Sequence, residues 1–169
     1  IYNKLKNYES EVDKNDSTYW LYFDVIWRDF FKYVSMQHKD KFFSRDGIYG
    51  DNKEWSSDME ILSNWINGKT NEPFVNANMI ELLETGFMSN RGRQNVANYL
   101  TKELKIDWRI GAEYFESMLI DYDVHSNYGN WLYNAGIGND SMPFRKFNPK
   151  LQSERYDPNK LYEKTWLND

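Results

Sequence analysis

The chain of 169 residues contains no cysteine, so it has neither a disulfide nor a thiolate metal site. This absence fits a reducing, cytoplasmic compartment. No run of about 20 apolar residues occurs, and no membrane span is therefore expected. The charged start, residues 1–16, lacks the apolar segment of a signal peptide, so no targeting signal is expected either.

Several functional motifs are also missing. The two histidines, His38 and His125, lie far apart and match no metal-ligand spacing, so no metal site is expected. The sequence has no P-loop, no GxSxG and no GxGxxG within a strand–helix unit, which argues against nucleotide binding of the Rossmann type. The net charge of −5 and the pI near 5.1 also differ from those of a dedicated duplex-DNA binder, which is usually basic.

Aromatic residues, in contrast, are abundant. Seven Trp, thirteen Tyr and ten Phe make up 18% of the chain, although the mean hydropathy is −0.85. One interpretation is a core packed with aromatic rings, each of which buries a large apolar area. The other is that some rings surround a planar cofactor or carry electrons.

The hydrophobic periodicity is helical throughout, without strand-like alternation. It predicts an all-α class, an irregular multi-helix domain with connections longer than those of a simple bundle. The mostly polar residues 38–53 are expected to form a loop. Capping signals set the other boundaries: Asp16 or Ser17 before the first helix, Gly68 and Gly86 after two others, Asp107 before a fourth. The predicted helices span residues 17–34, 57–67, 76–85, 90–103, 107–120 and 124–134, with two short ones behind Asn148-Pro149 and Asp157-Pro158.

Asn90, Arg91 and Arg93 open one predicted helix. Free backbone N–H groups and the helix dipole favour anions at such a position. Two guanidinium groups there fit a phosphate or an electron-rich ring edge. A capped, solvated helix start is the alternative interpretation.

Asp121, Asp123 and Asn127 follow an apolar run. Carboxylates beside buried residues are costly unless they are paired, so Asp121 is predicted to pair with Arg93. Asp123 is suited to accept hydrogen bonds from a ligand, and Asn127 offers both a donor and an acceptor to a ring nitrogen. The alternative is that Asp121 or Asp123 simply caps the next helix.

These segments resemble the FAD-binding helical domain of the photolyase/cryptochrome family, and in particular its DASH-type cryptochromes. The matching stretches are STYWLYFDVIWRDFF, NWINGKTNEPFVNANM, GFMSNRGRQNVANYL, IDWRIGAEYFESMLIDYDVHSNYGNW and FNPKLQSERYDPNKLYEKTWL. The resemblance implies FAD as cofactor, with Asn127 beside flavin N5. It implies FAD contacts for Phe87, Asn90, Arg93, Phe115, Asp121, Asp123 and Asn127.

Three tryptophans stand where the family keeps its electron-transfer chain between the surface and the flavin. They are Trp131, Trp108 and Trp55. Indole rings are oxidisable and can serve as stepping stones for electrons. The alternative for each of them is plain core packing.

The resemblance further implies repair of cyclobutane pyrimidine dimers in single-stranded DNA, driven by blue light, by a carbon–carbon lyase of the deoxyribodipyrimidine photo-lyase type. Arg91 and Arg145 are then expected to contact phosphates. Gln94 and Tyr133 follow the DASH pattern. The residues expected to meet the flipped-out lesion are Asp24, Trp27, Asn90, Gln94 and Tyr133.

The sequence departs from the family pattern at several positions. Asp24 replaces the usual Glu and is one methylene shorter, Asn71 and Asn76 replace Gly and Asp, and His125 stands where DASH members commonly have Cys. The antenna domain and the Ser/Thr-rich loop that holds the FAD phosphates do not occur within these residues. Residues 1–169 are accordingly expected to form one helical domain, the C-terminal part of a longer protein or the product of a truncated gene.

Several expectations follow from the missing loop. Occupancy by FAD is doubtful, an antenna cofactor is not expected, and catalysis is expected to be impaired in this chain alone. A missing N-terminal segment is a candidate partner beside FAD and single-stranded DNA. Two alternative functions remain, a flavin photosensor without enzymatic activity and a truncated remnant that folds without cofactor.

Overall fold

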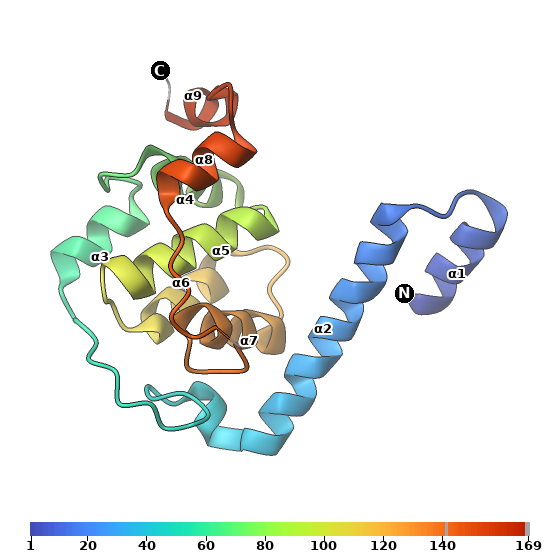
Figure 1. The fold of residues 1–169 in the computed structure, drawn as a ribbon, viewed down its shortest axis with the longest axis horizontal. Coiled ribbons are helices and arrows are strands. Elements are labelled where there is room, and N and C mark those ends of the chain that lie inside the picture. The colour runs from blue at the N-terminus through green and yellow to red at the C-terminus, as the bar shows by residue number, and fades with distance from the viewer. Residues whose placement is uncertain (141, 168–169) are drawn as a thin grey trace.

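The computed structural model describes residues 1–140 and 142–167, and within these ranges the chain is built from helices (Figure 1). The described backbone forms no β-strand, only one isolated bridge between Ser56 and Ile106. The predicted all-α class is confirmed. The helices are α1 (Tyr2–Glu11), α2 (Asp16–His38), η1 (Lys39–Phe43), α3 (Met59–Ile66), α4 (Pro73–Thr85), α5 (Asn90–Asn98), η2 (Tyr99–Glu103), α6 (Trp108–Met118), α7 (Val124–Ala135), α8 (Pro149–Tyr156) and α9 (Leu161–Leu167).

Several of the predicted helix ends are confirmed, although the helix predicted over 76–85 begins at Pro73 and the one predicted over 17–34 continues to His38. Gly86 follows α4 in the left-handed conformation, with φ of 70°, and Gly68 adopts the same conformation just after α3. The side chain of Asp107 caps α6, and that of Asn148 caps α8, which begins at Pro149. These positions follow directly from local chemistry, because glycine alone tolerates positive φ without cost and short polar side chains satisfy free backbone N–H groups.

Other boundaries differ from the prediction. Neither Asp16 nor Ser17 caps α2, because Asn15 does so and forms a capping box with Thr18. The expected loop at residues 38–53 contains the 3₁₀ helix η1. The predicted helix over residues 90–103 consists of the α-helix α5 and then η2, which is a π-helix.

The last helix begins later than predicted. Asp157 does not place Pro158 at the start of a helix, since its carboxylate accepts hydrogen bonds from the backbone N–H groups of Tyr162 and Glu163, at 3.1 and 2.9 Å. Helix α9 therefore starts at Leu161.

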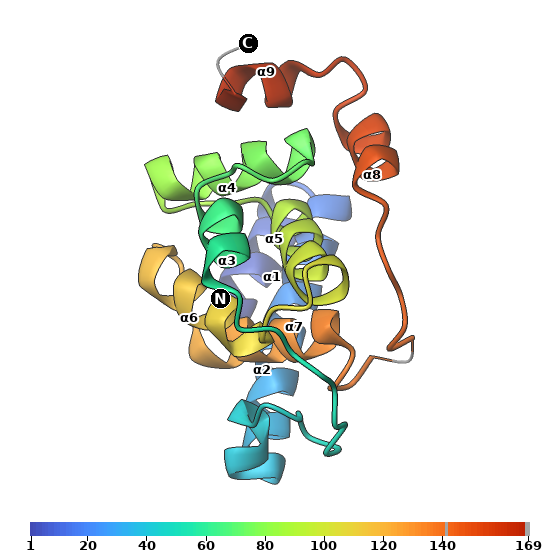
Figure 2. The same ribbon diagram turned by 90° about the vertical axis from the view of Figure 1, so that its left-hand side faces the viewer.

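Helix α5 lies at the centre of the body, where it packs on α4 and α7 (Figures 1 and 2). Helix α6 packs against α7, and α9 packs against α4. Figure 2 shows the connection after α7 running along one side of the body to α8. The largest fully buried side chains include Trp65, Trp108, Trp131, Phe42, Met79, Leu82, Met88 and Leu100.

Helix α2 departs from the rest of the body. Its C-terminal half packs on α7, whereas its N-terminal half extends outward with α1 beside it (Figure 1). Phe31 and Val34 are therefore buried, but Tyr19 is 59% exposed and Trp20 is 57% exposed. An aromatic core explains only part of the high aromatic content, because this stripe meets solvent.

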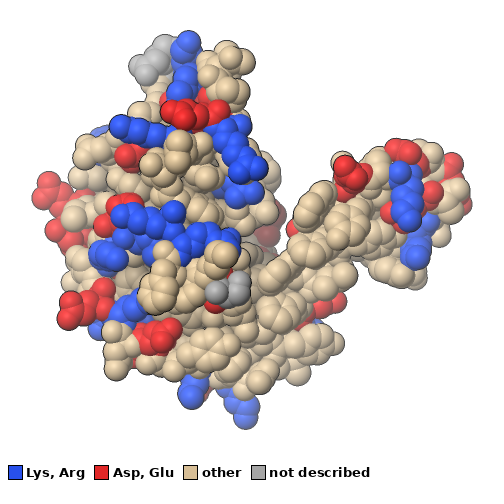
Figure 3. Space-filling view, viewed as in Figure 1, with Lys and Arg blue, Asp and Glu red and all other residues tan. Residues whose placement is uncertain are grey.

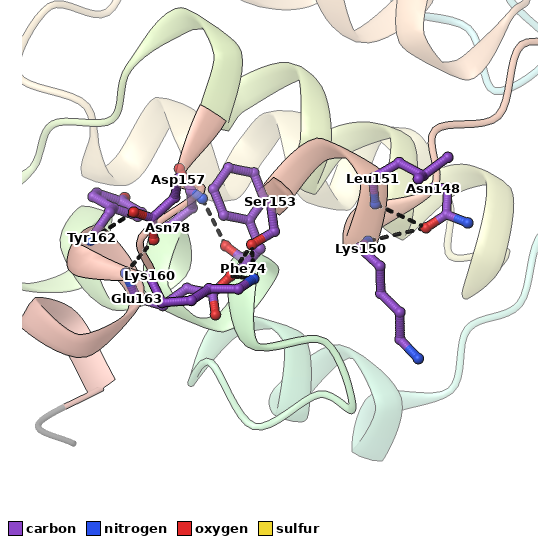
Figure 4. A network of polar contacts seen from close by, with 10 residues as sticks. All are labelled: Phe74, Asn78, Asn148, Lys150, Leu151, Ser153, Asp157, Lys160, Tyr162 and Glu163. Atoms are coloured by element: carbon purple, nitrogen blue, oxygen red, sulfur yellow. Dashed lines mark hydrogen bonds and ion pairs between the residues drawn. The ribbon is translucent and has the colours of Figure 1, made fainter. Parts of the chain in front are cut away.

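Polar contacts join α8 to α9, as Figure 4 shows, and a further hydrogen bond fixes α9 onto α4. The hydroxyl of Tyr162 donates to Glu81 Oε2 at 2.6 Å. Burial first, and then the negative charge of Glu81, raise the pKa of Tyr162 above its ordinary value. Ser153, Lys160 and Glu163 form a second cluster of hydrogen bonds, which joins α8 to α9 (Figure 4).

Candidate functional site

The start of α5 and the segment before α7 are joined by an ion pair. Arg93 Nη2 donates to both carboxylate oxygens of Asp121, at 3.0 and 2.9 Å. Arg93 Nε also donates to the backbone oxygen of Met88, at 2.8 Å, which fixes the guanidinium plane. The predicted pairing of Arg93 with Asp121 is confirmed, and it brings together two residues that are expected to contact a flavin.

Exposed apolar side chains surround this ion pair. Phe87 lies under the guanidinium, with the Arg93 carbon 5.7 Å from the ring centroid. The backbone N–H of Ile120 donates to the oxygen of Gly86 at 3.0 Å, so Ile120 and Phe87 belong to neighbouring segments. Phe87, Ile120 and Val124 are all exposed. An apolar rim around charged hydrogen-bonding groups suits a flat ligand with polar edges.

Asp123 caps helix α7. Its Oδ1 accepts from the backbone N–H of Ser126 at 2.9 Å, as the capping interpretation expects. Partial burial acts to raise the pKa of Asp123, but the hydrogen bonds from Ser126 and the nearby His125 and Arg28 outweigh it. The pKa of Asp123 is therefore lowered, and this carboxylate is an acceptor at neutral pH.

Asn127 lies one turn further along α7 and is buried. Its Nδ2 donates to the backbone oxygen of Ala112 in α6 at 2.9 Å, which orients the amide. Phe115, one turn after Ala112, is also buried. The contact fixes Asn127 in position, and the expected role beside a flavin stays a prediction.

Trp131 is 2% exposed and packs in the centre of the body. Its ring meets Phe115 edge-on, with centroids 5.1 Å apart, and Trp65 in the same manner at 6.3 Å. Gly111 of α6 permits this packing, because an added β-carbon would lie 2.3 Å from the Trp131 ring. The helices α6 and α7 are thus close at the position that the electron-transfer interpretation places next to the flavin.

Trp108 and Trp55 lie further along the predicted chain. Trp108 is completely buried and packs edge-on against Tyr128, with centroids 6.0 Å apart. Trp55 is half-buried in an irregular segment before α3. Core packing accounts for the position of Trp108, and Trp55 packs against the edge of the same core.

The residues expected to meet DNA fall into three groups. On α5, Arg91 Nη1 donates to Gln94 Oε1 at 2.9 Å, and Asn90 is exposed at the helix start. Tyr133 and Arg145 form a second group, joined by a long hydrogen bond of 3.5 Å. Lys and Arg side chains gather on the face shown in Figure 3, although the net charge is negative.

The third group, Asp24 and Trp27, lies on α2. Asp24 is exposed, and Trp27 packs against rings of its own helix, including Phe30 at 5.2 Å and Phe31 at 5.3 Å. Asp24 lies in the N-terminal half of α2. The described structure does not bring Asp24 next to the groups on α5 and α7.

The sequence interpretation missed several residues at the site. Trp65 packs directly on Trp131, and Tyr156 of α8 lies under Arg91, with the guanidinium carbon 4.8 Å from the ring centroid. Trp65 stands in the stretch NWINGKT, so a local signal existed. Tyr156 also stands in a matching stretch, but its pairing with Arg91, more than 60 residues away along the chain, had no local signal.

Within residues 1–140 and 142–167, no group of three or more His, Cys, Asp or Glu side chains is placed to hold a metal ion. No helix in the described part of the chain is both long and apolar enough to cross a membrane.

The fold and the site define an all-helical cofactor-binding domain with a tryptophan-rich centre. Residues 20–169 match the family described as the FAD binding domain of DNA photolyase. The chain belongs to this family of photolyase and cryptochrome FAD-binding domains.

Individual relatives agree with this assignment. The chain is 55% identical to a cryptochrome DASH from Synechocystis, covering 99% of this chain and 34% of the relative. It is 52% identical to a cryptochrome DASH from Danio rerio, covering 99% and 32%. The chain thus spans about a third of the length of the curated relatives it matches.

Solved structures show the same likeness. A Synechocystis cryptochrome is 54% identical and superposes with a TM-score of 0.95, covering 99% of this chain and 35% of that one. A class III photolyase from Agrobacterium tumefaciens is 33% identical with a TM-score of 0.86, covering 95% and 33%.

The residues present fit the ring of FAD. Arg93 and Asp121 present charged hydrogen-bonding groups, and both are partly exposed beside the apolar rim of Phe87, Ile120 and Val124. Asn127, in the first turns of α7, adds an amide group that its hydrogen bond to Ala112 orients. This set combines apolar surface with donors and acceptors, as an isoalloxazine ring requires.

Proposed function

We propose that the chain binds the isoalloxazine part of FAD at the N-terminal ends of α5 and α7. The observation that carries the proposal is the ion pair of Arg93 with Asp121 beside an exposed apolar rim. In this proposal Asn90, Arg93 and Asp121 bind the polar edge of the ring, and Phe87 packs nearby. Asp123 accepts from ligand N–H or hydroxyl groups, and Asn127 lies beside the reacting nitrogen.

FAD, when bound, supplies a light-absorbing ring that exchanges single electrons. The protein delivers electrons to the ring along three tryptophans. Trp55 is the outermost, Trp108 comes next, and Trp131 is nearest the ring. Burial supports this role, because Trp131 and Trp108 are shielded from water and from other reactants. Phe115 and Trp65 hold Trp131 in one orientation.

The proposed reaction is blue-light-driven repair of cyclobutane pyrimidine dimers in single-stranded DNA. Asp24, Trp27, Asn90, Gln94 and Tyr133 face the lesion in this proposal. Single strands are favoured because extruding a base from a duplex costs a few kcal/mol. An acidic chain has little bulk attraction to phosphates with which to offset that cost. Arg91 and Arg145 then contact the backbone phosphates.

A second candidate is a flavin photosensor that repairs no DNA. The course of α2 favours it, because the N-terminal half of this helix stands away from α5 and α7 (Figure 1). The shorter carboxylate of Asp24 also reaches less far than Glu. Light-driven flavin reduction without any dimer cleavage separates this candidate from the first.

Titration of the purified chain with FAD tests the cofactor proposal. We expect weak, saturable binding that is lost during purification, because the Ser/Thr-rich phosphate loop does not occur in these residues. Flavin fluorescence and the visible absorption bands report binding. Arg93→Met should abolish it, whereas Arg109→Met, which removes the same charge from α6, should not. Binding that is unaffected by Arg93→Met contradicts the proposed site, and a stoichiometric yellow protein contradicts the expected weakness.

A further inference from the structure

Arg45 contacts both outer tryptophans of the proposed electron path. Its backbone oxygen accepts from Trp108 Nε1 at 3.2 Å. Its guanidinium Nη2 donates to the backbone oxygen of Trp55 at 3.3 Å. One residue, which lies outside every predicted helix, thus joins a buried indole to a half-buried one.

The turn that carries Arg45 is held firmly in place. The N–H of Gly47 donates to Ser44 O at 2.9 Å, and the N–H of Ile48 donates to Ile137 O at 3.2 Å. Gly47 has φ of 69°, and an added β-carbon would lie 2.3 Å from Ile137 O. Arg45 therefore sits on a fixed support that connects to the end of α7.

The segment with Trp55 has fewer supports. Beyond the contact from Arg45, it is tied by the bridge at Ser56, whose N–H donates to Lys105 O at 2.7 Å. On its outer side, Trp55 lines an open cleft of about 610 Å³ together with Arg45, Asp46, Asn52, Lys53 and Glu54. The inner side of Trp55 packs against the hydrophobic core, and Arg45 provides a hydrogen bond that holds its backbone.

The groups around the two indoles offer no base to their N–H groups. An indole that has lost an electron therefore keeps its proton and remains a radical cation. Trp108 Nε1–H points to a backbone oxygen, which is not a base. Trp55 Nε1 is buried and has no hydrogen-bond partner among the described residues. Neither indole therefore faces a protein group that would take its proton after oxidation. Arg45 Nε lies 3.7 Å from Asp107 Oδ2, so its own charge is partly balanced.

We propose that Arg45 is a positioning residue that couples Trp108 to Trp55 in the outermost step of electron transfer. The inference rests on the proposed function. In this step one electron passes from Trp55 to the Trp108 radical cation, which forms when Trp108 gives up an electron inward through Trp131. Trp108 is restored with its N–H intact, Trp55 becomes the radical cation, and no proton leaves either indole.

A test without cofactor uses the indole N–H signals in ¹⁵N-edited NMR, with Trp55→Phe and Trp108→Phe for assignment. Arg45→Met should shift the Trp55 signal. Because it removes the hydrogen bond to the Trp55 backbone oxygen, it should make local opening of this segment, and with it exchange of the buried indole N–H, about fivefold more frequent. Arg45→Lys should restore part of the protection. Arg109→Met is the matched control, because Arg109 pairs with the same Asp107 at 2.8 Å. Equal Trp55 signals in Arg45→Met and Arg109→Met overturn the inference.

The second test uses the chain loaded with FAD and a light flash. Arg45→Met should lower the yield of long-lived tryptophan radical severalfold while the first flavin reduction persists, and Arg109→Met should match the wild type. An unchanged yield in Arg45→Met overturns the inference but leaves the proposed function intact. Absence of photoreduction in the flavin-loaded wild type, or normal photoreduction in Trp131→Phe, contradicts the proposed function, and the inference falls with it.

Discussion

Gly129 of α7 lies against the ring of Phe31 of α2, so closely that an added β-carbon would come within 2.2 Å of the ring. The absence of a side chain at Gly129 is therefore what lets the C-terminal half of α2 pack on α7. Because α7 also carries Asn127 and Trp131, this contact sets the distance between α2 and the candidate site.

Gly129→Ala should destabilise the fold, although Ala favours helix by about 1 kcal/mol over Gly. Overpacking costs about 1–3 kcal/mol, so the expected net loss in the free energy of unfolding is up to about 2 kcal/mol. Urea denaturation measures it. In the Phe31→Leu background the same change should cost less, since the smaller side chain leaves room. Equal costs in both backgrounds would show that the two residues are not coupled.

Asp121→Asn should weaken FAD binding far more than it weakens the fold. The ion pair with Arg93 is partly exposed, so its loss should lower the free energy of unfolding by no more than about 1 kcal/mol. Glu103→Gln is the matched control, because it breaks the exposed pair with Lys146 elsewhere on the chain. Flavin titration and thermal melting of both variants decide the matter. If Asp121→Asn and Glu103→Gln bind flavin with similar affinity, Asp121 does not belong to the flavin site.

Trp131→Phe should block flavin photoreduction and leave FAD binding nearly unchanged. The smaller ring leaves a void in a fully packed site, so we also expect a loss of about 1–3 kcal/mol in the free energy of unfolding. Trp65→Phe is the control of equal burial, and it should retain photoreduction. Absorbance of the oxidised flavin under blue light reports the outcome. Normal photoreduction in Trp131→Phe would end the assignment of the tryptophan chain.

Lys102 makes stability depend on pH. Its Nζ donates to the backbone oxygens of Ala135 and Pro143, at 2.8 and 2.6 Å. Burial first, and then the neighbouring ammonium of Lys53, lower the pKa of Lys102 from 10.5 to about 8. The folded chain therefore releases a proton near pH 8 that the unfolded chain keeps until about pH 10.5.

Between these two pH values the unfolded state binds more protons, so the free energy of unfolding should rise with pH. Because Lys102 is only half-buried, we expect a rise of about 1–2 kcal/mol, less than the full shift implies. Urea denaturation between pH 7 and 9 measures it, because tyrosines of the unfolded chain, with a pKa near 10, are still almost entirely protonated there. Lys102→Met should remove most of the rise and leave the part contributed by Lys53, whose pKa burial also lowers, whereas Lys146→Met should keep the full rise. A wild-type stability that stays flat or falls across this range would contradict the prediction.

Asp24→Glu should increase repair of pyrimidine dimers in single-stranded DNA, because the longer carboxylate reaches further toward the lesion. One additional hydrogen bond in the transition state corresponds to about a fivefold gain in rate. Asp29→Glu makes the same change on the same helix and should have no effect. Matched single- and double-stranded substrates under blue light, with FAD supplied, provide the assay. Equal rates on both substrates would contradict the DASH-type proposal, and no response to Asp24→Glu would remove its role.

Local chemistry explains what the sequence predicted well. Gly68 and Gly86 end helices because of their backbone freedom, and Asp107 begins one because of its side chain. The pairing of Arg93 with Asp121 was also predictable, because a carboxylate after an apolar run needs a partner and the resemblance pointed to the same two residues. Each of these features depends on a few neighbouring residues or on a segment that matches the family.

Other features depend on contacts that no short segment encodes. The stripe along α2 has a clear helical period, but periodicity does not tell whether another element covers it. The π-helix at Tyr99–Glu103 differs from an α-helix by one residue in a turn, which a hydrophobic pattern does not register. Arg45 lies in an irregular turn, so only the folded chain shows that it meets Trp108 and Trp55.

The uncovered aromatic stripe on α2 has a practical consequence for work in solution. Dyes such as ANS fluoresce when they bind exposed apolar surface, and they are used to detect partly folded states. Tyr19, Trp20 and Ile26 offer such surface in the fully folded chain. A bright ANS signal from this protein therefore reports the native α2 and cannot be taken as a sign of unfolding.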